Sequence, residues 1–176
     1  MLRLSAFLVA ASSAAAIAVV HLAAASAGPG AAVVSRSTRV ASVAPACPLP
    51  ARYRGAFELA ARQTALPLPL LVAVARVESR VDQSVESSRG ARGLLQVLPS
   101  TASALGLDAS RARTNVLAGA RYLRQLLERF QSADLALAAY NAGPTAVGRS
   151  GGAPSGETMT YVANVTVVWR SLRGCR

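Results

Sequence analysis

The chain has 176 residues, of which 52% are hydrophobic and 15% charged, and its net charge is +11. This length suits about one domain, and so many apolar residues beside so few charges exclude a disordered chain. All 19 basic residues are arginine, which excludes a phosphate-binding P-loop because that motif needs a lysine. A cationic chain suits nucleic acid, anionic membrane surfaces or anionic cell-wall polymers.

Residues 1–27 have the pattern of a signal peptide for export. Arg3 supplies the positive charge, residues 4–20 are apolar, and Ala25-Ser26-Ala27 forms a small-residue cleavage site. Because the apolar run is near the shortest that spans a bilayer, an uncleaved membrane anchor is the alternative. Cleavage would remove His21, the only histidine. The mature chain would then lack Ser-His and Cys-His nucleophile pairs, which leaves carboxylates for proton transfer.

Residues 28–46 are rich in Ala, Val, Ser and Pro, and this composition predicts a flexible linker. We expect the folded domain to begin near Cys47 and to occupy residues 47–176. Cys47 and Cys175 bracket this domain, and an exported protein meets an oxidising compartment. We therefore expect a Cys47–Cys175 disulfide, and two free thiols are the alternative.

The first half of the domain predicts two helices. Apolar residues recur at helical spacing over residues 52–65. The prolines of residues 66–69 break this pattern and begin a second helix that ends at Glu78, since proline is accepted in a first turn. A loop is expected over residues 80–92, and the stretch 93–98 after it is mostly apolar.

The sequence of the second half of the domain predicts four further helices. A short helix is expected over residues 101–105, and Asn115 is expected to cap the start of a longer amphipathic helix. A third apolar segment runs from Asp134 to a Gly-Pro stop, and a loop over residues 149–156 separates it from a last helix over residues 157–172. No alternating strand pattern appears, so the predicted fold is mainly α, with one domain.

The second predicted helix places Glu78 on its apolar face. Leu71, Val74 and Ala75 lie seven, four and three residues before it and so share that face. A carboxyl group in apolar surroundings should have a raised pKa, and an acid that keeps its proton near neutral pH suits general acid catalysis. The alternative is a glutamate at the edge of the stripe whose carboxylate reaches water.

Four short segments stand out together in the domain. They are Glu78-Ser79, residues 90–96 (Gly-Ala-Arg-Gly-Leu-Leu-Gln), residues 139–143 (Ala-Tyr-Asn-Ala-Gly) and Glu157-Thr158 with Tyr161. In this order and spacing they resemble the catalytic domain of the soluble lytic transglycosylases of bacterial cell walls. The resemblance covers about residues 52–172 and implies a lysozyme-like fold. It also implies that Asp82 caps a loop rather than pairs with Glu78, because the family commonly has Asp or Asn there.

The resemblance implies that Glu78 is a single catalytic acid. It would protonate the glycosidic oxygen between N-acetylmuramic acid and N-acetylglucosamine. As a carboxylate, it would then take the proton from the muramic acid 6-hydroxyl, which attacks the anomeric carbon and closes a 1,6-anhydro ring. Ordinary glycosidases use two carboxyl groups instead, and the sequence leaves a hydrolysing muramidase of the same fold as the alternative.

The resemblance also implies five substrate-binding residues, each with a structural alternative. Ser87 would hold a substrate N-acetyl group, or serve only in a turn. Gln96 would line the sugar cleft, or its amide would bond to the backbone. Tyr140 and Asn141 would form a stacking and hydrogen-bonding edge, or an ordinary helix end. Tyr161 would orient the catalytic acid or line its pocket, or only pack.

These observations predict an exported peptidoglycan lytic transglycosylase in the periplasm, the cell wall or the extracellular space. Its partners would be peptidoglycan glycan strands, and no cofactor, metal ion or nucleic acid is expected. An uncleaved signal would add membrane anchoring. The remaining alternative is a non-catalytic cationic wall-binding domain. Against that alternative, aromatic residues are only 5% of the chain, too few for a stacking platform, and the arginines are spread along the chain.

Overall fold

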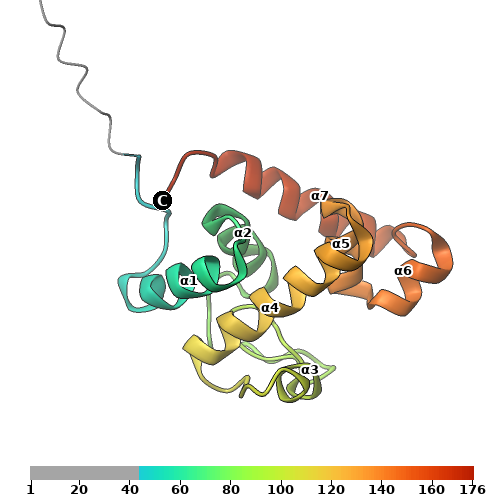
Figure 1. Cartoon of the computed structure of the whole chain (residues 1–176), viewed down its shortest axis with the longest axis horizontal. Helices are drawn as coiled ribbons and strands as arrows, with labels where there is room; N and C mark the ends of the chain where they lie inside the picture. Colours follow the sequence, from blue (N-terminus) through green and yellow to red (C-terminus); the bar gives the residue numbers. More distant parts are fainter. Residues whose placement is uncertain (1–43) are drawn as a thin grey trace, which may run out of the picture. The chain divides into compact units, whose positions relative to one another are not determined.

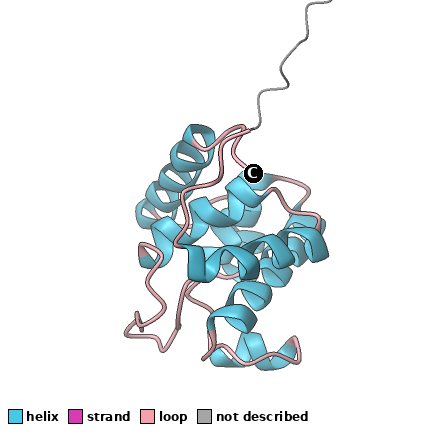
Figure 2. Ribbon diagram, turned by 90° about the vertical axis from the view of Figure 1, so that its left-hand side faces the viewer, coloured by secondary structure: helices cyan, strands magenta, loops and turns pink. Residues whose placement is uncertain are grey.

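Seven α-helices make up the regular structure of residues 44–176, the part of the chain that the computed structural model describes (Figure 1). They are α1 (Ala51–Thr64), α2 (Leu68–Ser79), α3 (Pro99–Ala104), α4 (Ala112–Phe130), α5 (Ala133–Ala142), α6 (Pro144–Ser150) and α7 (Gly156–Ser171). Figure 2 shows helices and loops without a strand in this part of the chain, which confirms the mainly α prediction. The predicted signal peptide and residues 28–43 of the predicted linker lie outside the described residues.

The starts of these helices follow from the local sequence. Pro69, Pro99 and Pro144 lie in the first turns of α2, α3 and α6, where a missing N–H costs no helical hydrogen bond. Ser132 and Ser155 cap α5 and α7, because their hydroxyl oxygens accept hydrogen bonds from backbone N–H groups three residues later.

Two predicted helix boundaries are wrong. Asn115 does not cap α4, which begins at Ala112 after Arg111; its side chain is fully buried inside the domain instead. The predicted loop over residues 149–156 begins too early, because α6 occupies Pro144–Ser150. The Gly-Pro pair that ends α5 also begins α6, since the proline that stops one helix suits the first turn of the next.

The helices pack as neighbours around an aliphatic core. α1 packs against α4, α4 against α5, α2 against α7, and α5 against both α6 and α7. The largest fully buried aliphatic and aromatic side chains include Phe57, Leu71, Leu94, Leu95, Leu123 and Leu137. Leu71, Val74 and Ala75 are at most 1% exposed, so the predicted apolar face of α2 is buried.

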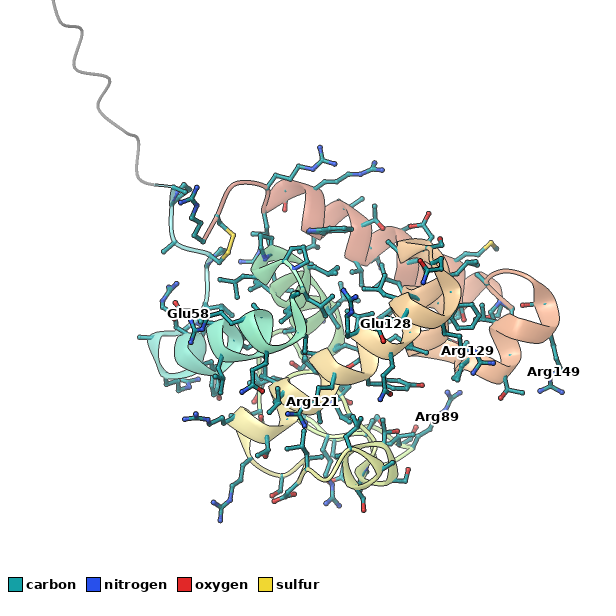
Figure 3. The ribbon with its side chains drawn as sticks, viewed as in Figure 1. Glu58, Arg89, Arg121, Glu128, Arg129 and Arg149 are labelled. Carbon is teal, nitrogen blue, oxygen red and sulfur yellow. A yellow bond between two sulfur atoms is a disulfide. The ribbon has the colours of Figure 1, made fainter. Side chains whose placement is uncertain are left out.

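The two ends of the described chain are joined. Cys47 and Cys175 form the predicted disulfide, visible as a yellow bond in Figure 3. The Cys47 N–H donates to the Arg176 carbonyl at 2.9 Å, and the Arg176 N–H donates to the Pro45 carbonyl at 2.9 Å. The start of the domain is thereby fixed beside the C-terminal end of α7. Among the described residues, the helices are each too short or too polar to cross a membrane.

Candidate active site

Glu78 lies in the last turn of α2, with a partly buried side chain. Its Oε1 accepts a hydrogen bond of 2.7 Å from the Tyr161 hydroxyl, which reaches it from α7. Burial raises the pKa of Glu78 from its ordinary value of 4.5 to about 7, although the hydrogen bond from Tyr161 opposes this rise. Near neutral pH this carboxyl group is therefore divided between its protonated and ionised forms, so it can both donate and accept a proton.

The end of α2 is held in an unusual backbone conformation just after Glu78. Arg80 and Val81 both have positive φ angles, 55° and 65°, and a valine in this region is strained. The Val81 N–H donates to the Ala75 carbonyl at 3.1 Å, which closes the helix end. The Ser79 hydroxyl lies 2.9 Å from the Leu94 carbonyl oxygen, and this hydrogen bond joins the helix end to the loop over residues 93–97.

Asn115 fixes that loop from α4. Its Oδ1 accepts from the Leu95 N–H at 2.9 Å, and its Nδ2 donates to the carbonyls of Arg92 at 2.7 Å and Ala109 at 3.1 Å. Gly119, one turn along α4, leaves room for the loop, because an added Cβ would lie 2.6 Å from Leu95 Cδ1. Neither role was predicted from the sequence. The pattern that could have indicated them is an asparagine and a glycine four residues apart on the buried face of one helix.

Tyr140 reaches the same loop from α5. Its hydroxyl donates to the Leu95 carbonyl at 2.8 Å, and its ring lies 5.4 Å from the ring of Tyr122 on α4, measured between centroids. Burial raises the pKa of the Tyr140 hydroxyl well above its ordinary range, and the nearby charge of Glu78 adds to the rise. Tyr140 is therefore a neutral hydrogen-bond donor that connects the Glu78 region with the loop.

A pocket of about 200 Å³ opens beside this loop. It brings together three predicted site residues, Gln96, Tyr140 and Asn141. Its other lining residues are Arg89, Val97, Leu98, Thr101, Tyr122, Ala142 and Gly143. Ala142 and Gly143 belong to the predicted segment 139–143, whereas Arg89 and Tyr122 were not predicted as site residues. Arg89 projects from the loop region on the α3 side, as labelled in Figure 3.

The polar site residues are largely held by the protein itself. The Gln96 Nε2 donates to the carbonyls of Val85 at 2.9 Å and Gly93 at 3.0 Å, so Gln96 both lines the pocket and bonds to the backbone. The Asn141 Oδ1 accepts from the Thr158 hydroxyl at 3.1 Å. These contacts fix how the two amides are presented to the pocket.

Ser87 and Asp82 have roles in turns. The Ser87 hydroxyl oxygen accepts from the Ala91 N–H at 3.1 Å, and Ser87 is not among the residues that line the pocket. Asp82 is exposed and accepts from the Ser84 N–H at 2.8 Å, as predicted for a turn cap. Its hydrogen bonds with Ser84 lower the pKa of Asp82, so it is ionised at neutral pH and is not a proton donor there.

The helical fold, with Glu78 at the end of α2, belongs to the lysozyme-like class, as a match to a solved structure shows. The 70 kDa soluble lytic transglycosylase of Escherichia coli superimposes with a TM-score of 0.57 and 29% identity, over 70% of this chain and 25% of that one. The chain belongs to the transglycosylase SLT domain family, whose profile matches residues 55–159.

Two further relatives agree with this assignment. A membrane-bound lytic murein transglycosylase F of Alkalilimnicola ehrlichii is 39% identical over 100 residues, which cover 52% of this chain and 20% of the relative. The lytic transglycosylase Slt of Pseudomonas aeruginosa, solved as an inactive mutant, gives a TM-score of 0.59 at 27% identity, over 73% of this chain and 25% of that chain. The chain thus spans only about a fifth to a quarter of the length of these relatives.

Proposed function

We propose that this domain is an exported peptidoglycan lytic transglycosylase in which Glu78 is the single acid and base. The observation that carries the proposal is the Glu78 carboxyl group, with a pKa of about 7 and a hydrogen bond from Tyr161. Family membership supports the substrate class. The related Pseudomonas aeruginosa protein supports the catalytic group, because its inactive mutant replaces a glutamate with glutamine.

The proposed reaction has two proton transfers. Protonated Glu78 donates to the glycosidic oxygen as the bond between that oxygen and the anomeric carbon of N-acetylmuramic acid breaks. The Glu78 carboxylate then takes the proton of the muramic acid 6-hydroxyl, whose oxygen bonds to the anomeric carbon. The products are a 1,6-anhydro end and a free 4-hydroxyl on N-acetylglucosamine, and Glu78 ends in its starting form. The reaction consumes no water, so no second carboxylate is required.

Tyr161 has a defined part in this scheme. Its hydroxyl donates to Oε1 of Glu78, and this donation favours the carboxylate form that exists between the two transfers. Tyr161 is 8% exposed and its pKa is raised well above the ordinary range by burial, so it stays neutral and keeps donating. It is therefore a positioning residue for Glu78.

Gln96, Tyr140 and Asn141 are the proposed sugar-binding residues. They line one pocket, and each is fixed by hydrogen bonds to backbone or side-chain groups. A preorganised edge of this kind loses little side-chain entropy when a glycan binds. For Ser87 the proposed contact with an N-acetyl group stays a prediction, since its hydroxyl oxygen serves a turn.

Export is part of the proposal because the substrate lies outside the cytoplasmic membrane. The Cys47–Cys175 disulfide supports it, since disulfides persist in oxidising compartments. The predicted signal over residues 1–27 would direct this export.

Cleavage of purified glycan strands by Glu78→Gln tests the assignment. Glutamine keeps the shape of the side chain and an acceptor for Tyr161 but transfers no proton, so we expect a loss of at least about hundredfold in rate. Glu157→Gln is the matched control, because Glu157 is an exposed acid in the first turn of α7. Wild-type activity in Glu78→Gln would reject the proposal.

A further inference from the structure

The outward face of α7 carries an apolar stripe that the rest of the domain does not cover. Met159 is 59% exposed and Val167 is 66% exposed. Ala163 lies between them at helical spacing, so the three side chains share one face. From Thr158 to Trp169 the helix contains no Asp, Glu, Arg, Lys or His. These three side chains line one side of an open, mostly apolar groove of about 410 Å³ between α5 and α7.

Arginines gather at the C-terminal end of this stripe. Arg170, Arg173 and Arg176 are exposed, and neither of the two ion pairs among residues 44–176 involves them. Asp134 is the one acid that lines the groove and the adjoining cavity of about 380 Å³. The face therefore combines exposed apolar side chains with an excess of positive charge.

The preceding chain enters the domain at the same end. The Arg176 N–H donates to the Pro45 carbonyl at 2.9 Å, so the first described residues lie beside these arginines. The pocket with Gln96 lies on the side of α3, and Figure 1 shows α3 and α7 at opposite edges of the domain. A surface that held α7 would leave the pocket facing away from it.

We propose that the outward face of α7 docks the domain on an anionic phospholipid surface. Met159 and Val167 would enter the interfacial region, and Arg170 and Arg173 would contact lipid phosphates. Amphipathic helices with basic flanks bind in this way, through buried apolar area together with attraction to anionic lipid. In this orientation the pocket would face the cell wall while the domain stays at the membrane.

The single tryptophan, Trp169, permits a direct test in the full chain. It lies on α7 and lines the cavity beside Arg170 and Arg173. With vesicles of phosphatidylcholine and phosphatidylglycerol that carry brominated acyl chains, we expect Trp169 fluorescence to shift to the blue and to be quenched. Phosphatidylcholine vesicles alone should have little effect. Binding through residues 1–27 alone would leave Trp169 unquenched and would overturn the proposal.

Two variants and a matched control separate the apolar and charged contributions. Val167→Glu should raise the lipid concentration needed for half of the Trp169 response roughly tenfold. The double variant R170E/R173E should require about twenty-five times more lipid for the same Trp169 response, since each arginine near an anionic surface contributes about fivefold. The control double variant R113E/R121E changes the net charge by the same amount, but at two exposed residues of α4 (Arg121 is labelled in Figure 3). It should weaken the Trp169 response much less.

Equal losses in the two double variants would overturn the proposal, because they would indicate attraction through net charge alone. A dimer that Val167→Glu dissociates, found together with no response to anionic vesicles, would also overturn it and would assign this face to a second copy. Far-ultraviolet circular dichroism of each variant checks that the helices are intact.

Discussion

Replacement of Glu78 by glutamine should stabilise the domain in a pH-dependent way while it abolishes catalysis. The pKa of Glu78 is about 7 in the folded protein and 4.5 ordinarily, so the native state holds this proton more tightly than the unfolded chain. This tighter proton binding adds to the free energy of unfolding. The added stability is fully present below about pH 4.5 and is lost as the pH rises through 7. Glutamine is neutral at every pH and avoids the loss.

The size of the effect follows from the shift. At about 1.4 kcal/mol per pKa unit, the raised pKa of Glu78 destabilises the wild type at pH 8 by about 3 kcal/mol relative to an uncharged side chain. The carboxyl group is partly exposed, and its contact with solvent reduces this difference to about 2 kcal/mol. Urea unfolding of wild type and Glu78→Gln at pH 4, 6 and 8 measures it. We expect nearly equal free energies of unfolding at pH 4 and a growing advantage for the variant above pH 5.

Glu157→Gln serves as the control for this experiment, because Glu157 is exposed on α7. Its difference from wild type should stay constant from pH 5 to pH 8. If the advantage of Glu78→Gln were equally independent of pH, the carboxyl group would not be desolvated in the folded protein. The physical basis for a proton donor at Glu78 would then be wrong.

Three further predictions concern the supports of the site. Tyr161→Phe removes the hydrogen bond that lowers the pKa of Glu78, so the pH profile of glycan cleavage should move about one unit higher; Tyr53→Phe, a change on α1 outside the candidate active site, should leave the profile in place, and an unmoved profile in Tyr161→Phe would refute this role. Reduction of the disulfide at Cys175 should lower the free energy of unfolding by roughly 4–5 kcal/mol in the chain-entropy model, and an unchanged urea midpoint under reducing conditions would contradict this. Asn115→Ala should cost about 3 kcal/mol, because it leaves the Leu95 N–H and the Ala109 carbonyl without their partner, whereas the Arg92 carbonyl still accepts from the Val97 N–H; a loss below about 1 kcal/mol in urea unfolding would show that water replaces the amide.

The sequence predicted those features that depend on local pattern. The spacing of Leu71, Val74 and Ala75 placed Glu78 on an apolar face, and the structure buries that face. The two cysteines at the ends of the domain are paired as expected. In each case the evidence lay in residues near one another in sequence, or in a pair with a single possible partner.

Features that depend on tertiary contacts were missed. Asparagine is a residue type that often caps helices, but two of the three hydrogen-bond partners of Asn115, at Leu95 and Arg92, lie on a loop that only folding brings to α4. Tyr122 joins Tyr140 because α4 packs on α5, and periodicity does not give the rotation of one helix against another. Gly143 and Pro144 end one helix and begin the next, and propensity alone favours neither reading.

The most direct test of the account is the chemical form of the new glycan ends. Purified peptidoglycan strands incubated with the wild-type protein should yield fragments that end in 1,6-anhydro-N-acetylmuramic acid, lighter by one water than the hydrolysis product in mass spectrometry. Glu78→Gln should yield no fragments. Reducing N-acetylmuramic acid ends from the wild type would contradict the account, because water and not the 6-hydroxyl would then complete the reaction.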